Sequence, residues 1–231
     1  MATFAQKFLM GRKKKLERFA ENRTFPHFFE PTYDELLKGF PLKGRWQESF
    51  FGNADPLVLE LGCGKGEYTV GLARNNPKCS YIGIDRKGAR MWRGAKTSLV
   101  EGLKNVAFVR TRIELIEYLF APGEVDEIWI TFPDPQPRER NERKRLTSPR
   151  FLERYRKILR KGGLIHLKTD STLLYEYTSE LIGNLGYNVH FSTDDLYQSG
   201  FSGPARDIQT FYESGFLENG DRIKYLQFSF E

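Results

Sequence analysis

The hydrophobic residues of this chain form short, continuous apolar runs that alternate with stretches of helical periodicity. Apolar runs rich in branched residues are typical of strands that are buried on both faces of a parallel sheet. We expect such strands at 57–61, 80–85, 105–109, 125–132, 164–169, 187–193 and 222–230. Helices are expected at 66–75, 87–102, 113–120, 149–160 and 171–185. This alternation predicts an α/β fold with a mostly parallel, seven-stranded sheet and helices on both faces.

Three further features refine this prediction. No clear helix separates the last two expected strands, which indicates an antiparallel strand at the edge of the sheet. The segment 161–163, Lys-Gly-Gly, is expected to end the helix that begins at 149. Prolines interrupt residues 24–54, so this segment cannot be one helix and is expected to pack across the sheet, with Trp46 in the core. The length of 231 residues suits one domain, which we place at 24–231.

A strand, a glycine-rich turn and a helix start follow one another after residue 56. The apolar run 57–61 is followed by Gly62, Gly64 and Gly66, and a helical pattern begins at once. Glycine is needed where the backbone turns sharply and approaches a ligand without an intervening Cβ. Together these elements predict a nucleotide-type binding site. The dinucleotide spacing G-x-G-x-x-G would need glycine at 67, which is Glu67, so a dehydrogenase site is disfavoured.

Acidic residues end two of the expected strands. Glu60 precedes the first glycine, and Asp85 ends the strand 80–85. An acid in the second position can accept both ribose hydroxyls of an adenosine. The arrangement resembles the S-adenosylmethionine (AdoMet) site of the Rossmann-like class I methyltransferases, whose usual form is E-x-G-x-G-x-G. A tight turn with incidental acids is the simpler alternative, but the agreement of the glycine spacing with both acids favours the cofactor site.

The net charge of +6 is distributed unevenly. Residues 1–23 carry seven Lys or Arg and two Glu, and residues 138–161 carry eleven and three, so the rest of the chain is net negative. Two basic blocks on an otherwise acidic chain indicate a polyanionic partner. We interpret residues 1–23 as a basic N-terminal arm, disordered or loosely helical until it binds, although a solvated tail is an equal alternative.

Several classes of protein are disfavoured by composition. No apolar run reaches about 18 residues, so no membrane span is expected, and the N-terminus lacks the apolar region of a secretory signal. Cys63 and Cys79 provide neither a disulfide framework nor a metal-binding spacing. Cys63 lies inside the glycine turn and is interpreted as a small filler. A cytoplasmic protein without a metal is therefore expected.

A stiff, proline-rich loop follows the fourth expected strand. It contains three prolines in five residues, and Asp134 stands between Pro133 and Pro135. Ligands of open α/β sheets bind at the carboxyl ends of strands, which is where this acid is placed. A basic run follows directly, with the cations Arg138, Arg140, Arg143, Lys144 and Arg145. An acid positioned for a substrate atom therefore adjoins a run suited to phosphates, whose contacts position a nucleic acid without specifying its sequence.

Together these motifs resemble the bacterial tRNA (guanine-N7)-methyltransferase family, from about residue 7 to the end. That family has a strand ending in F-P-D-P-W, a K/R-H-x-K-R-R run, a T-D after the fifth strand and a T-x-Y/F-E near the C-terminus. The matching segments here are 132–135, 143–145, 168–170 and 210–213. The ordered set of motifs is much more specific than any one of them.

The resemblance implies an enzyme that transfers a methyl group from AdoMet to N7 of guanine 46 in the variable loop of tRNA. It implies that Asp134 is catalytic. The implied cofactor-binding residues are Glu60, Gly62, Gly64, Gly66, Asp85, Arg112 and Asp134. The implied substrate-binding residues are Arg138, Asp170, Thr210, Phe211, Tyr212 and Glu213. The RNA backbone would be bound by Arg140, Arg143, Lys144 and Arg145.

The chain departs from the family pattern at three positions. Arg112 stands where an acid or Asn usually lies near the adenine, so a carboxylate contact is lost there. Gln136 replaces a Trp, and Asn141 replaces a His. A methyltransferase for another RNA or a protein, and a non-catalytic RNA-binding module, therefore remain alternatives, although the intact glycines and acids argue against the module. Asp170 as a helix N-cap and Glu213 as a surface acid are simpler alternatives. Whether the protein is a monomer or a homodimer stays open.

Overall fold

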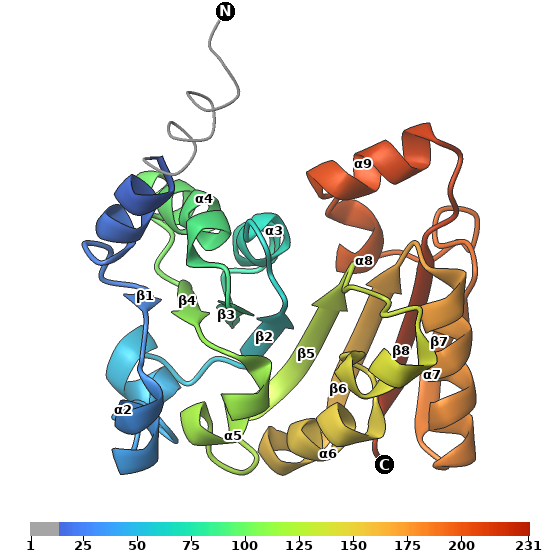
Figure 1. The fold of residues 1–231 in the computed structure, drawn as a ribbon, viewed down its shortest axis with the longest axis horizontal. Coiled ribbons are helices and arrows are strands. Elements are labelled where there is room, and N and C mark those ends of the chain that lie inside the picture. The colour runs from blue at the N-terminus through green and yellow to red at the C-terminus, as the bar shows by residue number, and fades with distance from the viewer. Residues whose placement is uncertain (1–13) are drawn as a thin grey trace, which may run out of the picture.

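Helices cover both faces of an eight-stranded sheet in the computed structural model, which describes residues 14–231 (Figure 1). The strands are β1 (Phe28–Phe29), β2 (Leu57–Leu61), β3 (Ser80–Asp85), β4 (Val106–Arg110), β5 (Val125–Thr131), β6 (Leu159–Thr169), β7 (Asn188–Thr193) and β8 (Lys224–Ser229). Their order across the sheet is β1-β4-β3-β2-β5-β6-β8-β7. Strand β8 pairs antiparallel with both β6 and β7, whereas the other pairings are parallel.

The helices connect successive strands. They are α2 (Tyr33–Lys38), α3 (Glu67–Asn75), α4 (Gly88–Val100), α5 (Ile116–Leu119), α6 (Pro149–Ile158), α7 (Thr172–Asn184), α8 (Pro204–Asp207) and α9 (Phe211–Glu218). Shorter turns are the π-helical η1 (Trp46–Phe51) and the 3-10 segments η2 (Ile113–Leu115) and η3 (Glu139–Lys144). No helix within residues 14–231 is long and apolar enough to cross a bilayer.

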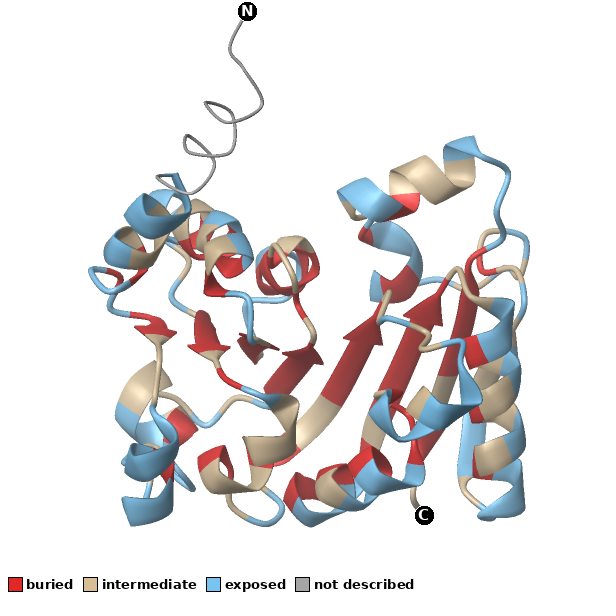
Figure 2. Cartoon of the chain, viewed as in Figure 1, coloured by how far each residue is buried: buried red, intermediate tan, exposed pale blue. Residues whose placement is uncertain are grey.

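Two hydrophobic cores lie on opposite faces of the sheet. Successive residues of a strand point to opposite faces, so Leu57, Leu59 and Leu61 join the core beneath α5, α6 and α7, whereas Val58 joins the core beneath α3 and α4. The central strands are buried along most of their length (Figure 2), which is why they appear as continuous apolar runs in the sequence. Trp46 is fully buried in the first core, as predicted.

The α/β class, the mostly parallel sheet and the two helical layers are confirmed. The described strands number eight rather than seven because the segment 24–54 contributes β1, whose two residues are too few for a detectable pattern. The antiparallel strand is β8, which lies between β6 and the edge strand β7. The expectation of no helix between the last two strands was wrong. Helix α8 has only four residues, and the one buried residue of α9 is a charged one, Glu213, so neither helix has an apolar periodicity.

The expectation that 161–163 ends a helix was also wrong. Helix α6 ends at Ile158, and β6 begins at the next residue. Gly162 adopts a φ of +69°, and a Cβ on Gly163 would lie 2.9 Å from the backbone oxygen of Asp126. The register between β5 and β6 shifts at this place. The two glycines therefore form a bulge inside a strand, which needs the same left-handed backbone as a helix end.

The second half of the predicted basic arm packs on α4. Residues 14–22 are helical, and residues 1–13 of the arm lie outside the described part of the chain. The Glu21 carboxylate accepts a hydrogen bond from the Trp92 indole at 2.6 Å and forms an ion pair with Lys96 at 2.8 Å. The Asn22 amide donates to the backbone oxygen of Gly88 at 2.9 Å. These contacts attach the described half of the arm to the domain.

The strand order reverses between β2 and β5. From β2 the chain proceeds to β3 and β4 on one side, and β5 and β6 then build the other side. Because the connecting helices leave to opposite faces at such a point, a crevice opens at the carboxyl ends of the two strands, and ligands bind there. Glu60 of β2 and Thr131 of β5 meet at this crevice, joined by a 2.6 Å hydrogen bond.

Candidate active site

A cleft of about 430 Å³ opens at the carboxyl ends of the central strands. Its wall includes six of the expected cofactor-binding residues, Glu60, Gly62, Gly64, Asp85, Arg112 and Asp134. It also includes four expected substrate or phosphate contacts, Arg143, Lys144, Thr210 and Tyr212. Segments that are up to 152 residues apart, from Glu60 to Tyr212, are thus brought together around one cavity.

The three glycines of the turn have two different structural roles. Gly62, Gly64 and Gly66 adopt φ angles of +79°, +56° and +72°, which L-residues with a side chain rarely adopt. Gly62 and Gly64 line the cleft, but Gly66 does not. A Cβ on Gly66 would lie 2.6 Å from the ring of Phe108 and 3.2 Å from the Cα of Gly94. Gly66 therefore allows α3 and α4 to pack closely, and its expected contact with a cofactor stays a prediction.

Asp85 is held at the end of β3 by two backbone donors. Its Oδ2 accepts from the N–H of Gly64 at 3.0 Å, and its Oδ1 accepts from the N–H of Lys87 at 2.8 Å. Each oxygen retains further acceptor capacity, which ribose hydroxyls can use. A glycine-rich turn beside such an acid fits an adenosine-bearing cofactor. Glu114, which the sequence analysis did not single out, lines the same cleft two residues after Arg112.

Glu60 is buried and bound to neighbouring protein groups. One carboxylate oxygen accepts from the backbone N–H of Thr69 at 2.8 Å and contacts the hydroxyl of the same residue, and the other contacts the Thr131 hydroxyl at 2.6 Å. These contacts join β2, α3 and β5 beneath the turn. Burial raises the pKa of the Glu60 carboxyl to about 7, against the opposing effect of the hydrogen bonds from Thr131 and Thr69. Glu60 therefore supports the cleft from within.

We expect the Glu60 carboxyl to make stability depend on pH. Its folded pKa of about 7 exceeds the ordinary value of 4.5, so the folded state binds the extra proton between these values. The contribution of the protonated Glu60 carboxyl to the free energy of unfolding is present below pH 4.5 and is lost as pH rises to about 7. Relative to Glu60→Gln, the free energy of unfolding of the native protein should fall by about 2–3 kcal/mol between pH 5 and pH 8 in urea titrations. Parallel curves for the two proteins would contradict this expectation.

The loop that carries Asp134 has a strained backbone. Phe132 and Gln136 have φ angles of +46° and +47°, and they are the non-glycine residues with positive φ within residues 14–231. Such conformations are disfavoured and concentrate at functional sites. The Asp134 Oδ1 accepts from the N–H of Gln136 at 3.0 Å, while its Oδ2 accepts no hydrogen bond from the described residues. Asp134 is exposed at the cleft with one carboxylate oxygen available.

Arg145 holds this loop from beneath. Its guanidinium donates to the backbone oxygens of Pro135 and Gln136 at 3.2 and 3.3 Å and lies 4.3 Å from the ring centroid of Tyr177. Only 6% of Arg145 is exposed. Two of its N–H donors are thus used inside the protein, and its expected contact with RNA phosphate stays a prediction. The exposed Arg143 and Lys144 line the cleft and remain available to a phosphate.

Glu213 is buried in an internal ion pair and does not line the cleft. Its two carboxylate oxygens lie 2.6 and 2.7 Å from the Nζ of Lys168, and both side chains are fully buried. The carboxylate also accepts from the Tyr197 hydroxyl at 2.7 Å and closes a capping box with Thr210. The acceptors of Glu213 are thus occupied by Lys168, Tyr197 and the start of α9, and its expected contact with guanine stays a prediction.

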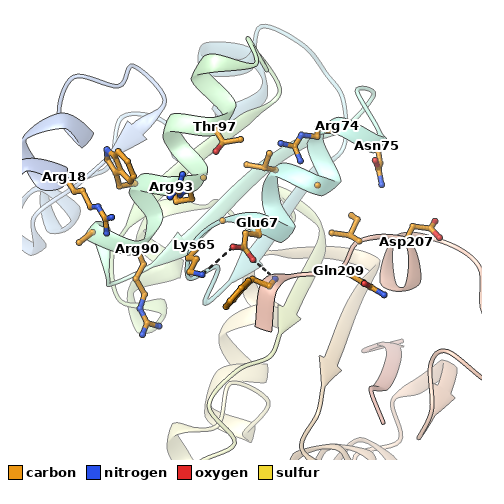
Figure 3. A pocket seen from close by; sticks show the side chains of 18 residues that line it. Arg18, Lys65, Glu67, Arg74, Asn75, Arg90, Arg93, Thr97, Asp207 and Gln209 are labelled. Atoms are coloured by element: carbon orange, nitrogen blue, oxygen red, sulfur yellow. Dashed lines mark hydrogen bonds and ion pairs between the residues drawn. The ribbon is translucent and has the colours of Figure 1, made fainter. Parts of the chain in front are cut away.

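The start of α9 is clamped against the glycine turn. The Glu67 carboxylate accepts from the backbone N–H of Phe211 at 2.9 Å (Figure 3). The Lys65 ammonium lies 4.5 Å from the ring centroid of Phe211 and 5.1 Å from that of Tyr212. These two rings are 70% and 50% exposed. The sequence pattern does not mark Lys65 and Glu67 as site residues, although Glu67 is the residue that breaks the dinucleotide pattern.

Three other expected residues do not line the cleft. Arg138 and Arg140 are exposed at the start of η3. Asp170 is half-buried and directly follows β6. Strand β6 pairs with β5, and Lys168 lies opposite Thr131, so Asp170 stands at the same end of the sheet as Thr131. Burial raises the pKa of the Asp170 carboxyl. The Asp170 carboxylate makes no hydrogen bond or ion pair with another described residue, so it can accept from a ligand.

Neither a metal nor a thiol is implicated at this site. Within residues 14–231, no group of three or more His, Cys, Asp or Glu residues is arranged to hold a metal ion. Cys63 is buried in the glycine turn, and its burial raises the pKa of its thiol well above the ordinary value. The thiol therefore stays protonated, in agreement with its interpretation as a small filler.

The sequence of this chain is similar to known proteins over most of its length. A family model described as "Putative methyltransferase" matches residues 54–226. A tRNA (guanine-N(7)-)-methyltransferase of Christiangramia forsetii is 54% identical over 221 residues, which cover 95% of this chain and 99% of the relative. The chain belongs to the tRNA (guanine-N7)-methyltransferase family. Another member, from Porphyromonas gingivalis, is 56% identical over 209 residues, 89% of this chain and 85% of that protein.

Solved structures share the fold of this family member at low sequence identity. The 16S rRNA methyltransferase KamB superposes with a TM-score of 0.59 at 16% identity, covering 85% of this chain and 93% of KamB. An antibiotic-related methyltransferase superposes with a TM-score of 0.57 at 20% identity, over 86% of this chain and 93% of that chain. These similarities confirm the Rossmann-like class I methyltransferase fold.

Proposed function

We propose that this chain transfers a methyl group from AdoMet to N7 of guanine 46 in the variable loop of tRNA, and that it does so in the cytoplasm. The observation that carries the proposal is the position of Asp134. A strained loop holds this carboxylate at the mouth of the glycine-turn cleft, and the cations Arg143 and Lys144 follow on the same wall. Membership of the family and the activity named for its close relatives support the same reaction.

The chemistry requires alignment more than proton transfer. Guanine N7 carries an in-plane lone pair and no proton, so no general base is needed to create the nucleophile. The lone pair attacks the methyl carbon as the bond from that carbon to sulfur breaks, and the sulfur keeps the electron pair. Alignment of the reactants contributes about 7–11 kcal/mol in favourable intramolecular systems. The methylated purine gains positive charge as the sulfonium loses it, so a carboxylate beside the ring stabilises the transition state.

Particular residues supply these requirements in our proposal. AdoMet would provide the methyl group. The backbone of Gly62 and Gly64 would surround the cofactor, and Asp85 would accept hydrogen bonds from its ribose hydroxyls. The available oxygen of Asp134 would face the guanine. Asp170, at the end of the neighbouring strand β6, would accept hydrogen bonds from the N1–H and the amino group of the guanine. The exposed rings of Phe211 and Tyr212 offer surfaces on which a base turned out of its stack can rest.

The test is methyl transfer from labelled AdoMet to unmodified total tRNA, followed by nucleoside analysis and mapping of the product. The proposal requires label in 7-methylguanosine at the variable loop. Label in another nucleoside or another RNA would move the substrate assignment while leaving the cofactor site in place. If calorimetry showed AdoMet binding without any transfer, the chain would instead be a binding protein, and the proposed reaction would be wrong.

A further inference from the structure

A second cavity, of about 710 Å³, forms a groove between α3, α4, the helical segment 14–22 and the start of α9 (Figure 3). Its charged lining is mostly basic, with two acids, Glu67 and Asp207. The five cations that line it are Arg18, Lys65, Arg74, Arg90 and Arg93. Arg90 and Arg93 of α4 lie outside the two basic blocks of the sequence, 1–23 and 138–161.

Three of these cations have no acidic partner in the described part of the chain. Arg74 pairs with Glu101 and Lys65 with Glu67, but Arg18, Arg90 and Arg93 form no ion pair within residues 14–231. The undescribed residues 1–13 contain neither Asp nor Glu, so they cannot neutralise these cations either. Unneutralised like charges that line one concave surface attract a polyanion.

An aromatic side chain holds two of these cations in place. The Arg18 and Arg93 guanidinium carbons lie 4.8 and 5.6 Å from the ring centroid of Trp92, and both side chains reach the groove (Figure 3). The Trp92 indole is itself fixed by its hydrogen bond to Glu21. Cations that are already positioned lose less conformational freedom when they bind a phosphate.

The groove shares a wall with the proposed active site. Lys65, Glu67 and Arg90 line both the groove and the cofactor cleft. Arg90 and Arg18 also line a third hollow, whose charged residues within the described chain are all basic, among them Lys14, Lys15 and Arg86. A basic path therefore leads from the helical segment 14–22, past Arg90, to the cleft.

We propose that this groove binds the phosphate backbone of tRNA while the target guanine occupies the active-site cleft. The inference rests on the proposed function, since that function supplies the RNA. Arg18 and Arg93 would each contact phosphate, whereas Arg90, at the shared wall, would contact the backbone next to the reacting nucleotide. The contacts would orient the RNA without reading its sequence.

The test compares Arg18→Glu/Arg93→Glu with a matched control, Lys38→Glu/Lys104→Glu. The control changes the net charge equally, and its exposed lysines lie outside the groove. We expect the groove variant to raise the Kd for unmodified tRNA at least about tenfold. The magnitude of the slope of log K against log salt should fall by about 1.5–2, the effect of losing two phosphate contacts. AdoMet affinity should stay within about twofold, because Arg18 and Arg93 do not line the cleft.

The remaining outcomes separate this inference from the proposed function. Equal Kd values and salt slopes for the two double variants would overturn the inference. If charge reversal prevents folding, Arg18→Gln/Arg93→Gln should still raise Kd and lower the slope, and its failure to do so would overturn the inference equally. A native protein that binds tRNA through the groove but forms no 7-methylguanosine would sink the proposed reaction and leave the groove supported.

Discussion

Replacing Asp134 with Ala is expected to lower kcat for tRNA methylation by about 10²–10³, the effect typical of removing one preorganised polar group that stabilises a transition state. The carboxylate is exposed at the cleft and makes one local hydrogen bond, to the N–H of Gln136. Its removal should therefore change the Kd for AdoMet by less than about threefold, which is under 1 kcal/mol. Single-turnover kinetics with labelled AdoMet, together with calorimetry, measure both quantities.

Asp134→Asn is the matched control for this variant. It keeps the size of the side chain and an oxygen that can accept the same hydrogen bond, but it removes the charge. A comparable loss of kcat in Asp134→Asn would assign the effect to the charge, whereas near-normal turnover would assign it to the geometry of the loop. Near-normal turnover of Asp134→Ala would show that the group is not catalytic.

Lys168→Met should lower the free energy of unfolding by about 3–5 kcal/mol, because it leaves a buried carboxylate without its partner. Lys168 and Glu213 are both fully buried, and the Lys168 ammonium also donates to the backbone oxygen of Ile208 at 3.0 Å. Burial lowers the pKa of Lys168, while the Glu213 charge opposes that shift. Denaturant titration should show the loss directly, and the melting temperature should fall by on the order of 10 °C.

The double variant Lys168→Met/Glu213→Gln separates charge from packing. It removes the buried charge but keeps an amide that can accept from Thr210 and Tyr197, so most of the lost stability should return. The KM for tRNA should be raised in both the single and the double variant, because Thr210 and Tyr212 line the cleft from the helix that this ion pair anchors. A loss of less than about 1 kcal/mol in the single variant would mean that the pair does not anchor α9.

Some residues expected at the site from the sequence line the cleft and others do not, and this difference has a physical basis. Asp85, Gly62, Gly64 and Asp134 lie in the cleft, as their local patterns indicated. Arg145 and Glu213 matched motifs equally well, yet their side chains are directed into the protein. A motif specifies a residue type and a chain position, but whether a charged side chain faces a ligand depends on which distant groups already satisfy it.

Requirements that are local along the chain could be determined from the sequence alone. Glycines mark the left-handed turn at 62–66 because the backbone conformation itself excludes a side chain. Apolar runs mark β2 to β6 because strands covered on both faces bury most of their residues. The cofactor turn, the α/β class and the stiff loop around Asp134 all follow from constraints that involve residues close in sequence.

Only the tertiary structure decided which residues meet across the chain. Lys168 neutralises Glu213 from 45 positions away, and Glu67 binds the N–H of Phe211 from 144 positions away. Arg18 and Arg93 belong to separate helices, and they share one groove because segment 14–22 packs on α4. Electrostatic and packing interactions depend on distance in space, which the hydrophobic pattern along a chain does not encode.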